Sequence, residues 1–254
     1  MQAEKPGWPT EWSGISGKLP GALAQPSSGI ILTMQVRQKS AFFFFVLLSL
    51  AVIVDAQASI PTVSFRIDFP GANPSHYEIV VPKEGTGSYS SNGKINDQSD
   101  AADPAAIDFS VSDATRKEIF ELAKRAKYFT GKVDSGRQNI ANTGEKTLAY
   151  KDANHNSQAT YNFSNVAAVQ QLTSMFQGLS AALECGRRLT FFHRYQKLAL
   201  DDELKKMEEL NRENMLGDLQ AIAPILKSIA DDSSVMNVSR ARALRLLSAS
   251  ESTH

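Results

Sequence analysis

Several segments of the chain alternate apolar and polar side chains, which is typical of a β-strand with one buried face. The clearest is 62–69, whose apolar positions share one side: Val63, Phe65, Ile67 and Phe69. Residues 76–81 resume the pattern and predict a hairpin with it. Residues 82–104 are loop-like, rich in Gly, Ser, Asn and Asp, with room for a short strand at 87–91. Residues 106–111 alternate again.

A helical period appears further along the chain. Ser112 or Asp113 is expected to cap a helix whose apolar stripe is Ile119, Leu122, Ala123 and Ala126. Residues 146–150 and 159–163 predict a second hairpin, turned by Asp152, Asn154, His155 and Asn156. Another helix is expected from Ser164, and nearly everything after it has a helical pattern.

This order of elements predicts an α+β fold, with a small antiparallel sheet and a packed helix followed by an all-helical C-terminal part. We expect four parts along the chain. They are an N-terminal extension (1–33) that is mis-assigned or disordered, a signal peptide (34–58), an α+β domain (59–184) and a helical C-terminal region (185–254).

Residues 34–58 have the three-part layout of a secretory signal peptide. Arg37 and Lys39 form a basic start, residues 41–54 carry no charge, and small residues follow. Cleavage fits after Ala56 or Ala58, and the Ala-x-Ala pattern favours Ala58. The alternative is an uncleaved membrane anchor, although the apolar run is shorter than the roughly 20 residues that span a bilayer. The rest of the chain is exported in both cases.

The segment before the signal holds both tryptophans, Trp8 and Trp12, and has no helical or alternating period. Met34 directly precedes the basic start, as an initiator would. We therefore expect that translation begins at Met34.

Composition narrows the class of protein. The 254 residues include 27 Lys+Arg, 27 Asp+Glu and one cysteine. These figures exclude a disulfide-stapled miniprotein, a collagen-like fibre and a polytopic membrane protein. A neutral chain also argues against a nucleic-acid binder. Cleavage after Ala58 leaves 196 residues with a net charge of −1.

Two acidic segments are candidates for a calcium site. Asp152, Asn154 and Asn156 match the start of a calcium loop, but Ser157 and Phe163 stand where Gly and Glu are required. A hairpin turn selects the same residues. The second segment is a polar loop that contains Asp97, Asp100 and Asp103. We expect these residues to be solvated and not to bind calcium.

No residue is assigned as catalytic, cofactor-binding or metal-binding. The histidines have no metal-ligand spacing, and they are His76, His155, His193 and His254. No nucleophile-elbow, S-x-x-K or phosphate-loop motif is present. Cys185 is expected to be a small buried residue, with an intermolecular disulfide or a reactive thiol as alternatives.

Basic and aromatic residues interleave near residue 190: Arg187, Arg188, Phe191, Phe192, Arg194, Tyr195 and Lys197. An amphipathic helix with its aromatics facing the core explains this mixture. Binding to an anionic membrane surface is the alternative.

Three segments carry a resemblance to a known group: AIDFSVSDATRKEIFELAKRAKYF, TLAYKDANHNSQATYNF and AIAPILKSIADDSSVMNVSRARALRLL. With them, most of residues 60–247 resembles uncharacterised exported α+β proteins of soil bacteria. The resemblance implies a bacterial envelope setting, and it implies no activity and no site residues.

We therefore expect an exported, periplasmic or secreted protein that binds an unknown protein or envelope ligand without catalysis or cofactor. It has no nucleic-acid partner, and it touches the membrane only through 41–54 if that segment is uncleaved. One alternative is an extracytoplasmic hydrolase whose site is assembled only by the fold. Another is a structural envelope component that forms a homodimer through its C-terminal helices. A cleft joining carboxylates to His76 or His155 would favour the hydrolase, and an exposed apolar groove would favour binding.

Overall fold

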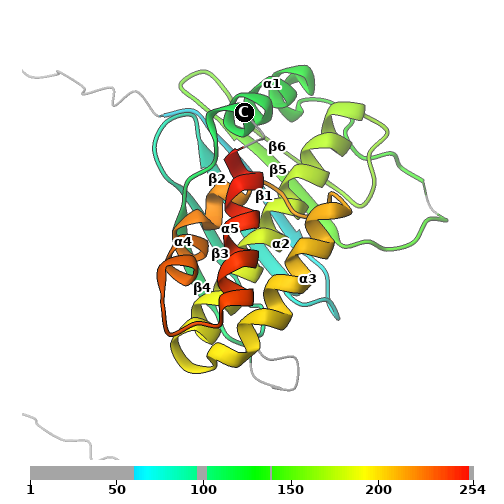
Figure 1. Cartoon of the computed structure of the whole chain (residues 1–254). Coiled ribbons are helices and arrows are strands. Elements are labelled where there is room, and N and C mark those ends of the chain that lie inside the picture. Colours follow the sequence, from blue (N-terminus) through cyan, green and yellow to red (C-terminus); the bar gives the residue numbers. More distant parts are fainter. Residues whose placement is uncertain (1–59, 96–101, 138, 252–254) are drawn as a thin grey trace, which may run out of the picture. The chain divides into compact units, whose positions relative to one another are not determined.

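The alternating segments form one antiparallel sheet. The computed structural model describes residues 60–95, 102–137 and 139–251, and these described residues belong to a single compact unit. Its six strands are β1 (Thr62–Asp68), β2 (His76–Pro82), β3 (Gly87–Ser91), β4 (Ala105–Phe109), β5 (Glu145–Lys151) and β6 (Asn156–Tyr161). They lie in the order β4-β3-β2-β1-β5-β6, with β1 and β2 at the centre (Figure 1).

The second hairpin differs from its predicted register. Its last strand ends at Tyr161, whereas a strand over 159–163 was expected. The side chain of Asp152 accepts hydrogen bonds from the backbone N–H groups of Asn154 (2.7 Å) and His155 (2.6 Å). These bonds close the turn early, so the strand starts at Asn156 and Phe163 lies beyond it.

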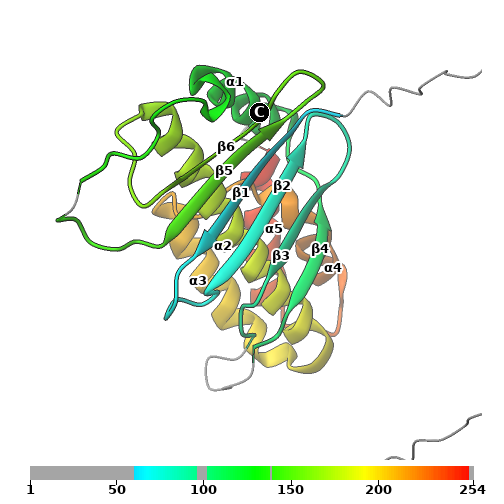
Figure 2. The same ribbon diagram turned by 180° about the vertical axis from the view of Figure 1, so that it is seen from behind.

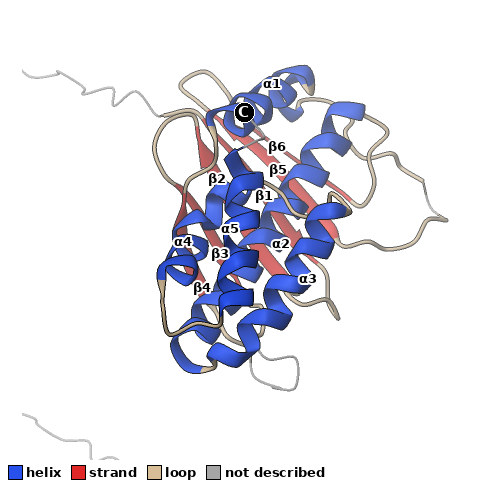
Figure 3. Cartoon of the chain, viewed as in Figure 1, coloured by secondary structure: helices blue, strands red, loops and turns tan. Residues whose placement is uncertain are grey.

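All the helices in the described part of the chain lie on one face of the sheet, as Figures 2 and 3 show from opposite sides. The α-helices are α1 (Asp113–Arg125), α2 (Ala167–Tyr195), α3 (Leu200–Arg212), α4 (Ala223–Asp231) and α5 (Asn237–Glu251). Short 3-10 turns are η1 (Lys127–Phe129), η2 (Lys197–Ala199) and η3 (Leu219–Ile222). A sheet followed by C-terminal helices confirms the predicted α+β class.

The ends of the first two helices show how local sequence sets them. Ser112 caps α1 as predicted, because its Oγ accepts a hydrogen bond from the Thr115 backbone N–H at 3.2 Å. The second helix begins at Ala167, later than the predicted Ser164. The Ser164 hydroxyl instead donates to the carbonyl of Val133 at 2.6 Å. Ser164 also forms an isolated β-bridge with Asp134. The expected boundary at 184/185 falls inside α2, which is continuous there.

The core lies between the sheet and α2. Alternate residues of β1, including Phe65, are fully buried under the helices. The Phe65 ring stacks on that of Phe176 in α2, with centroids 5.3 Å apart and planes 4° apart. The helices α1 and α2 contact the strands, α3 and α4 pack on α2, and α5 packs on α3 and α4. One side of the sheet is therefore sealed by helices.

Some sequence-based expectations concern other parts of the chain. The extension (1–33), the signal peptide (34–58), Asp97, Asp100 and His254 lie outside the described residues. Within 60–95, 102–137 and 139–251, no helix has the length and apolar character needed to cross a membrane.

Candidate ligand-binding site

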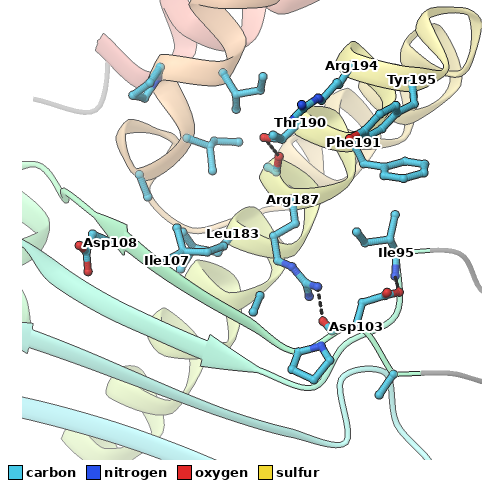
Figure 4. A pocket seen from close by; sticks show the side chains of 18 residues that line it. Ile95, Asp103, Ile107, Asp108, Leu183, Arg187, Thr190, Phe191, Arg194 and Tyr195 are labelled. Carbon is cyan, nitrogen blue, oxygen red and sulfur yellow. Dashed lines mark hydrogen bonds between the residues drawn. The ribbon is translucent and has the colours of Figure 1, made fainter.

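A cavity of about 720 Å³ lies at the edge of the sheet, between β4 and the C-terminal half of α2 (Figure 4). The turn η3 and the start of α4 form its third wall. Its walls are largely apolar, with Ile95, Ile107, Leu183, Phe191, Ile222 and Ile225 among them. Two arginines, Arg187 and Arg194, and two aspartates, Asp103 and Asp108, also line it, so the cavity combines apolar walls with a few charged groups.

Gly186 sets the closeness of two of these walls. A Cβ atom at this position would lie 2.5 Å from Cγ2 of Ile222 in η3. That distance is too short for any real contact, so only glycine lets η3 approach α2 this closely. The width of the cavity therefore depends on a residue without a side chain.

A buried polar network lies behind the cavity and is centred on Glu184 and Arg187. Their side chains are each 7% exposed, and Nη1 of Arg187 lies 2.7 Å from Oε2 of Glu184. The hydroxyls of Tyr89 (2.7 Å) and Ser91 (2.6 Å) in β3 donate to Oε1 of Glu184. Charge-assisted hydrogen bonds of this kind are among the strongest in proteins. They join α2 to β3.

The same arginine holds the segment that leads into β4. Its Nη2 donates to the backbone carbonyl of Asp103 at 2.5 Å (Figure 4). Gly93 lies against the pair, because a Cβ there would be 2.8 Å from Oε2 of Glu184. The network thus fixes the sheet edge relative to α2.

Tyr89 serves this network as a protonated donor. Burial, followed by the negative charge of Glu184, raises the pKa of Tyr89 well above its ordinary value. The hydroxyl also lies 3.1 Å from Oγ of Ser180. The buried charges of Glu184 and Arg187 therefore cancel, with neutral groups around them.

Arg194 differs from the other basic residues of this stretch. Arg188 pairs with Glu203 at 2.8 Å, and Lys197 pairs with Asp232 at 2.6 Å. Arg194 lies over the ring of Tyr195, 5.3 Å from its centroid, and has no ion pair with any residue that the structure describes. It is the cation at this cavity that is available to a ligand.

The aromatic residues of this stretch were expected to face the core, and only some of them do. Phe192 packs against the core, and Phe191 is half-buried at the cavity wall. Tyr195 also lines the cavity but is 62% exposed. An aromatic side chain is therefore left at the cavity mouth.

A second cavity, of about 950 Å³, lies between one end of the sheet and helices α2 and α3, and Cys185 lines it. The cysteine is 1% exposed, in line with the expected small buried residue. Burial raises the pKa of its thiol to about 12. A thiol with so high a pKa stays protonated and is a poor nucleophile.

The three histidines that the structure describes are dispersed over the fold, each beside a different aspartate. Nδ1 of His76 lies 2.6 Å from Asp68, Nδ1 of His155 lies 3.1 Å from Asp152, and Nε2 of His193 lies 2.9 Å from Asp232. None of the three lines the 720 Å³ or the 950 Å³ cavity. His76 and His155 therefore lie outside both of these cavities.

Two of the acidic candidates, Asp152 and Asp103, have structural partners. Asp152 closes the hairpin turn, as described above, and Oδ2 of Asp103 accepts a hydrogen bond from the backbone N–H of Ile95 at 3.2 Å. Across the described ranges, no three His, Cys, Asp or Glu residues are grouped so that they could hold a metal ion.

Sequence reasoning missed the partners of Arg187. Glu184 and Arg187 are three residues apart on one helix, a spacing that is common for exposed ion pairs. The continuous apolar pattern around them was the only sign that this pair is buried. No signal in the sequence pointed to Tyr89 or Ser91, which are more than 90 residues away along the chain.

A scan of known protein families finds no model that matches the chain, and no curated protein matches its sequence.

Proposed function

We propose that the chain is an exported binding protein without a catalytic role, and that its ligand occupies the cavity between β4 and α2. The ligand has an apolar body and carries a negative charge. The setting that we propose is the bacterial envelope, in keeping with the signal-like segment 34–58.

The shape and chemistry of the cavity carry this proposal. Its volume of about 720 Å³ is in the range of small-ligand sites, which are mostly apolar with a few placed polar groups. The apolar walls would contact the ligand body. Arg194, which has no ion pair among the described residues, would face its negative group.

The positions of the titratable groups favour binding over hydrolysis. A hydrolase of the kind considered from the sequence would place His76 or His155 beside carboxylates in a cleft. Each of these histidines instead pairs with one aspartate away from both large cavities. The apolar cavity at the sheet edge is the feature that a binding protein requires.

The test uses the processed chain from Ser59, since it contains all the described residues of the compact unit. Anilinonaphthalene sulfonate, an apolar fluorescent anion, is titrated into the protein. We expect one molecule to bind per chain, and we expect Thr190→Trp to abolish binding because Thr190 is an exposed residue of the cavity wall.

Ser174→Trp is the matched control, because Ser174 is also exposed on α2 but does not line the cavity. Far-ultraviolet circular dichroism checks that both variants fold. Equal binding by the wild type and Thr190→Trp would overturn the proposed site.

Export is tested separately in a bacterial host that produces the full chain. We expect the protein in the extracytoplasmic fraction, with Ser59 as its first residue by N-terminal sequencing. Retention in the cytoplasm, or a peptide from residues 1–33 in the natural product, would contradict this part of the proposal.

A further inference from the structure

The cavity beside β4 is one part of a longer groove. A neighbouring cavity of about 650 Å³ shares Asp108, Ala221 and Pro224 with the first. Residues 103–105 and 107 border only the first cavity, and residues 109–110 border only the second. The groove therefore follows β4 from its N-terminal to its C-terminal end, with η3 and α4 along the opposite wall.

The strand beside this groove is an open edge of the sheet. β4 pairs with β3 on one side and has no partner strand on the other among the described residues. An edge strand carries backbone N–H and C=O groups that can pair with another extended chain. Apolar side chains of β4, such as Ile107, line the groove at the same place.

The opposite edge of the sheet differs from β4, because a neighbouring segment bonds to residues at both ends of β6. Beyond β6, the Ser157 hydroxyl donates to the carbonyl of Tyr128 at 2.5 Å. The backbone N–H of Asn162 donates to the Asp134 carboxylate at 3.1 Å, and that of Ser135 donates to the carbonyl of Phe163 at 2.8 Å. The segment from Tyr128 to Ser135 thus bonds near both ends of β6, while a groove runs along β4.

We propose that the ligand is the C-terminal segment of another polypeptide, which adds to β4 as a seventh, antiparallel strand. The proposal rests on the proposed binding function and names its ligand. Backbone pairing with β4 would give affinity, and the cavities would take alternate side chains of the peptide. A small molecule would need only the first cavity, whereas an extended peptide uses the full length of the groove.

The direction of addition follows from the charges. The sheet is antiparallel throughout, and antiparallel pairing is slightly the more stable arrangement. An antiparallel peptide on β4 has its C-terminus at the Asp103 end of the groove. Arg187, Arg194 and Tyr195 lie over that end, with Asp108 at the other side (Figure 4). Arg187 is neutralised by Glu184, and the Asp103 carboxylate at this end accepts a hydrogen bond from the backbone N–H of Ile95. Arg194 is therefore the cation that pairs with the terminal carboxylate.

The test uses the processed chain and a fluorescein-labelled hexapeptide that alternates Thr with Val or Leu and ends in a free carboxylate. Fluorescence anisotropy measures its dissociation constant. Two further peptides carry N-methyl groups on the odd or on the even residues, because an extended strand points alternate N–H groups to opposite sides. We expect one methylated peptide to lose at least tenfold in affinity and the other to bind within threefold of the parent. Equal affinity of the two would overturn strand addition.

The role of Arg194 is tested with the same peptide as its C-terminal amide. We expect Arg194→Gln to weaken binding of the carboxylate peptide about tenfold, because one charge-assisted hydrogen bond is lost. Binding of the amide peptide should be unchanged. Arg212→Gln is the control, since Arg212 is an exposed arginine at the end of α3. Equal effects on the carboxylate and amide peptides would overturn the assignment of the carboxylate to Arg194.

A variant of the second cavity separates this inference from the proposed function. Gln220 is exposed and lines only the second cavity. We expect Gln220→Trp to weaken the hexapeptide at least tenfold and to leave anilinonaphthalene sulfonate binding unchanged. If anilinonaphthalene sulfonate binds and no hexapeptide does, the proposal of a peptide ligand is overturned while the proposed binding function stands. Light scattering measures the oligomeric state. A dimer that forms through β4 would overturn the peptide proposal, because the occupant of the groove would then be a second copy of the chain.

Discussion

The buried pair of Glu184 and Arg187 is expected to be a main determinant of stability and of the groove. In Arg187→Met, a carboxylate that is 7% exposed loses its counter-charge. The carbonyl of Asp103 also loses its hydrogen-bond donor. Removing one partner of a buried pair typically costs 3–5 kcal/mol. The hydroxyls of Tyr89 and Ser91 still donate to Glu184, so we expect the lower end, about 3 kcal/mol.

The double variant Glu184→Gln/Arg187→Met distinguishes a lost pair from a general disruption of packing. Replacing both members of a buried pair by neutral groups is often nearly neutral. We therefore expect the double variant to lose about 1–2 kcal/mol, less than Arg187→Met alone, despite carrying one more substitution.

Equilibrium unfolding in urea, followed by circular dichroism, measures these free energies. Lys227→Met is the control, since its ion pair with Asp231 is 73% and 65% exposed and should contribute little. A stability of Arg187→Met within about 0.5 kcal/mol of the wild type would refute the reasoning. A double variant as unstable as the sum of the two single variants would refute it as well.

Three further predictions follow from other buried groups. Gly186→Ala should lower the free energy of unfolding by about 1–3 kcal/mol and weaken ligand binding, because its Cβ would lie 2.5 Å from Ile222; unchanged urea unfolding would contradict this. Cys185 should not react with a thiol reagent until urea unfolds the protein, since it is 1% exposed with a pKa raised by burial to about 12; rapid native labelling would contradict this. Burial also raises the pKa of four of the six tyrosines, to about 12 for Tyr150 and Tyr161 and further for Tyr77 and Tyr89. Groups with a higher pKa when folded stabilise the protein below their unfolded pKa of about 10 and lose this effect as pH rises through the folded values. The free energy of unfolding should therefore fall above about pH 10, with the tyrosinate absorbance of these four appearing only on unfolding; their early ionisation in the folded protein would contradict this.

Local patterns in the sequence predicted most of the elements, because strands and caps depend on neighbouring residues. The alternation of Val63, Phe65 and Ile67 placed β1, and Ser112 placed the start of α1. One error arose where a distant contact decided the outcome, and the other where a local turn closed more tightly than the pattern indicated. The start of α2 moved because Ser164 bonds to Val133, and the start of β6 moved because Asp152 closes its turn tightly.

The groove could not be predicted from the sequence, since its walls come from three separated segments. β4, the C-terminal half of α2 and the η3–α4 turn meet only in the folded chain. The sequence did mark the basic and aromatic stretch that includes Arg194 and Tyr195. It could not show that Arg187 and Arg188 have carboxylate partners, which leaves Arg194 as the cation for a ligand.

Amide hydrogen exchange of the processed chain, with and without the hexapeptide, tests the binding groove most directly. Pairing of a peptide with β4 protects exposed backbone N–H groups of that strand from exchange. The account predicts slower exchange in residues 103–110 and in 220–227 when the peptide is bound, with β6 unchanged. Bound peptide that leaves 103–110 unchanged, or that protects another surface, would contradict it.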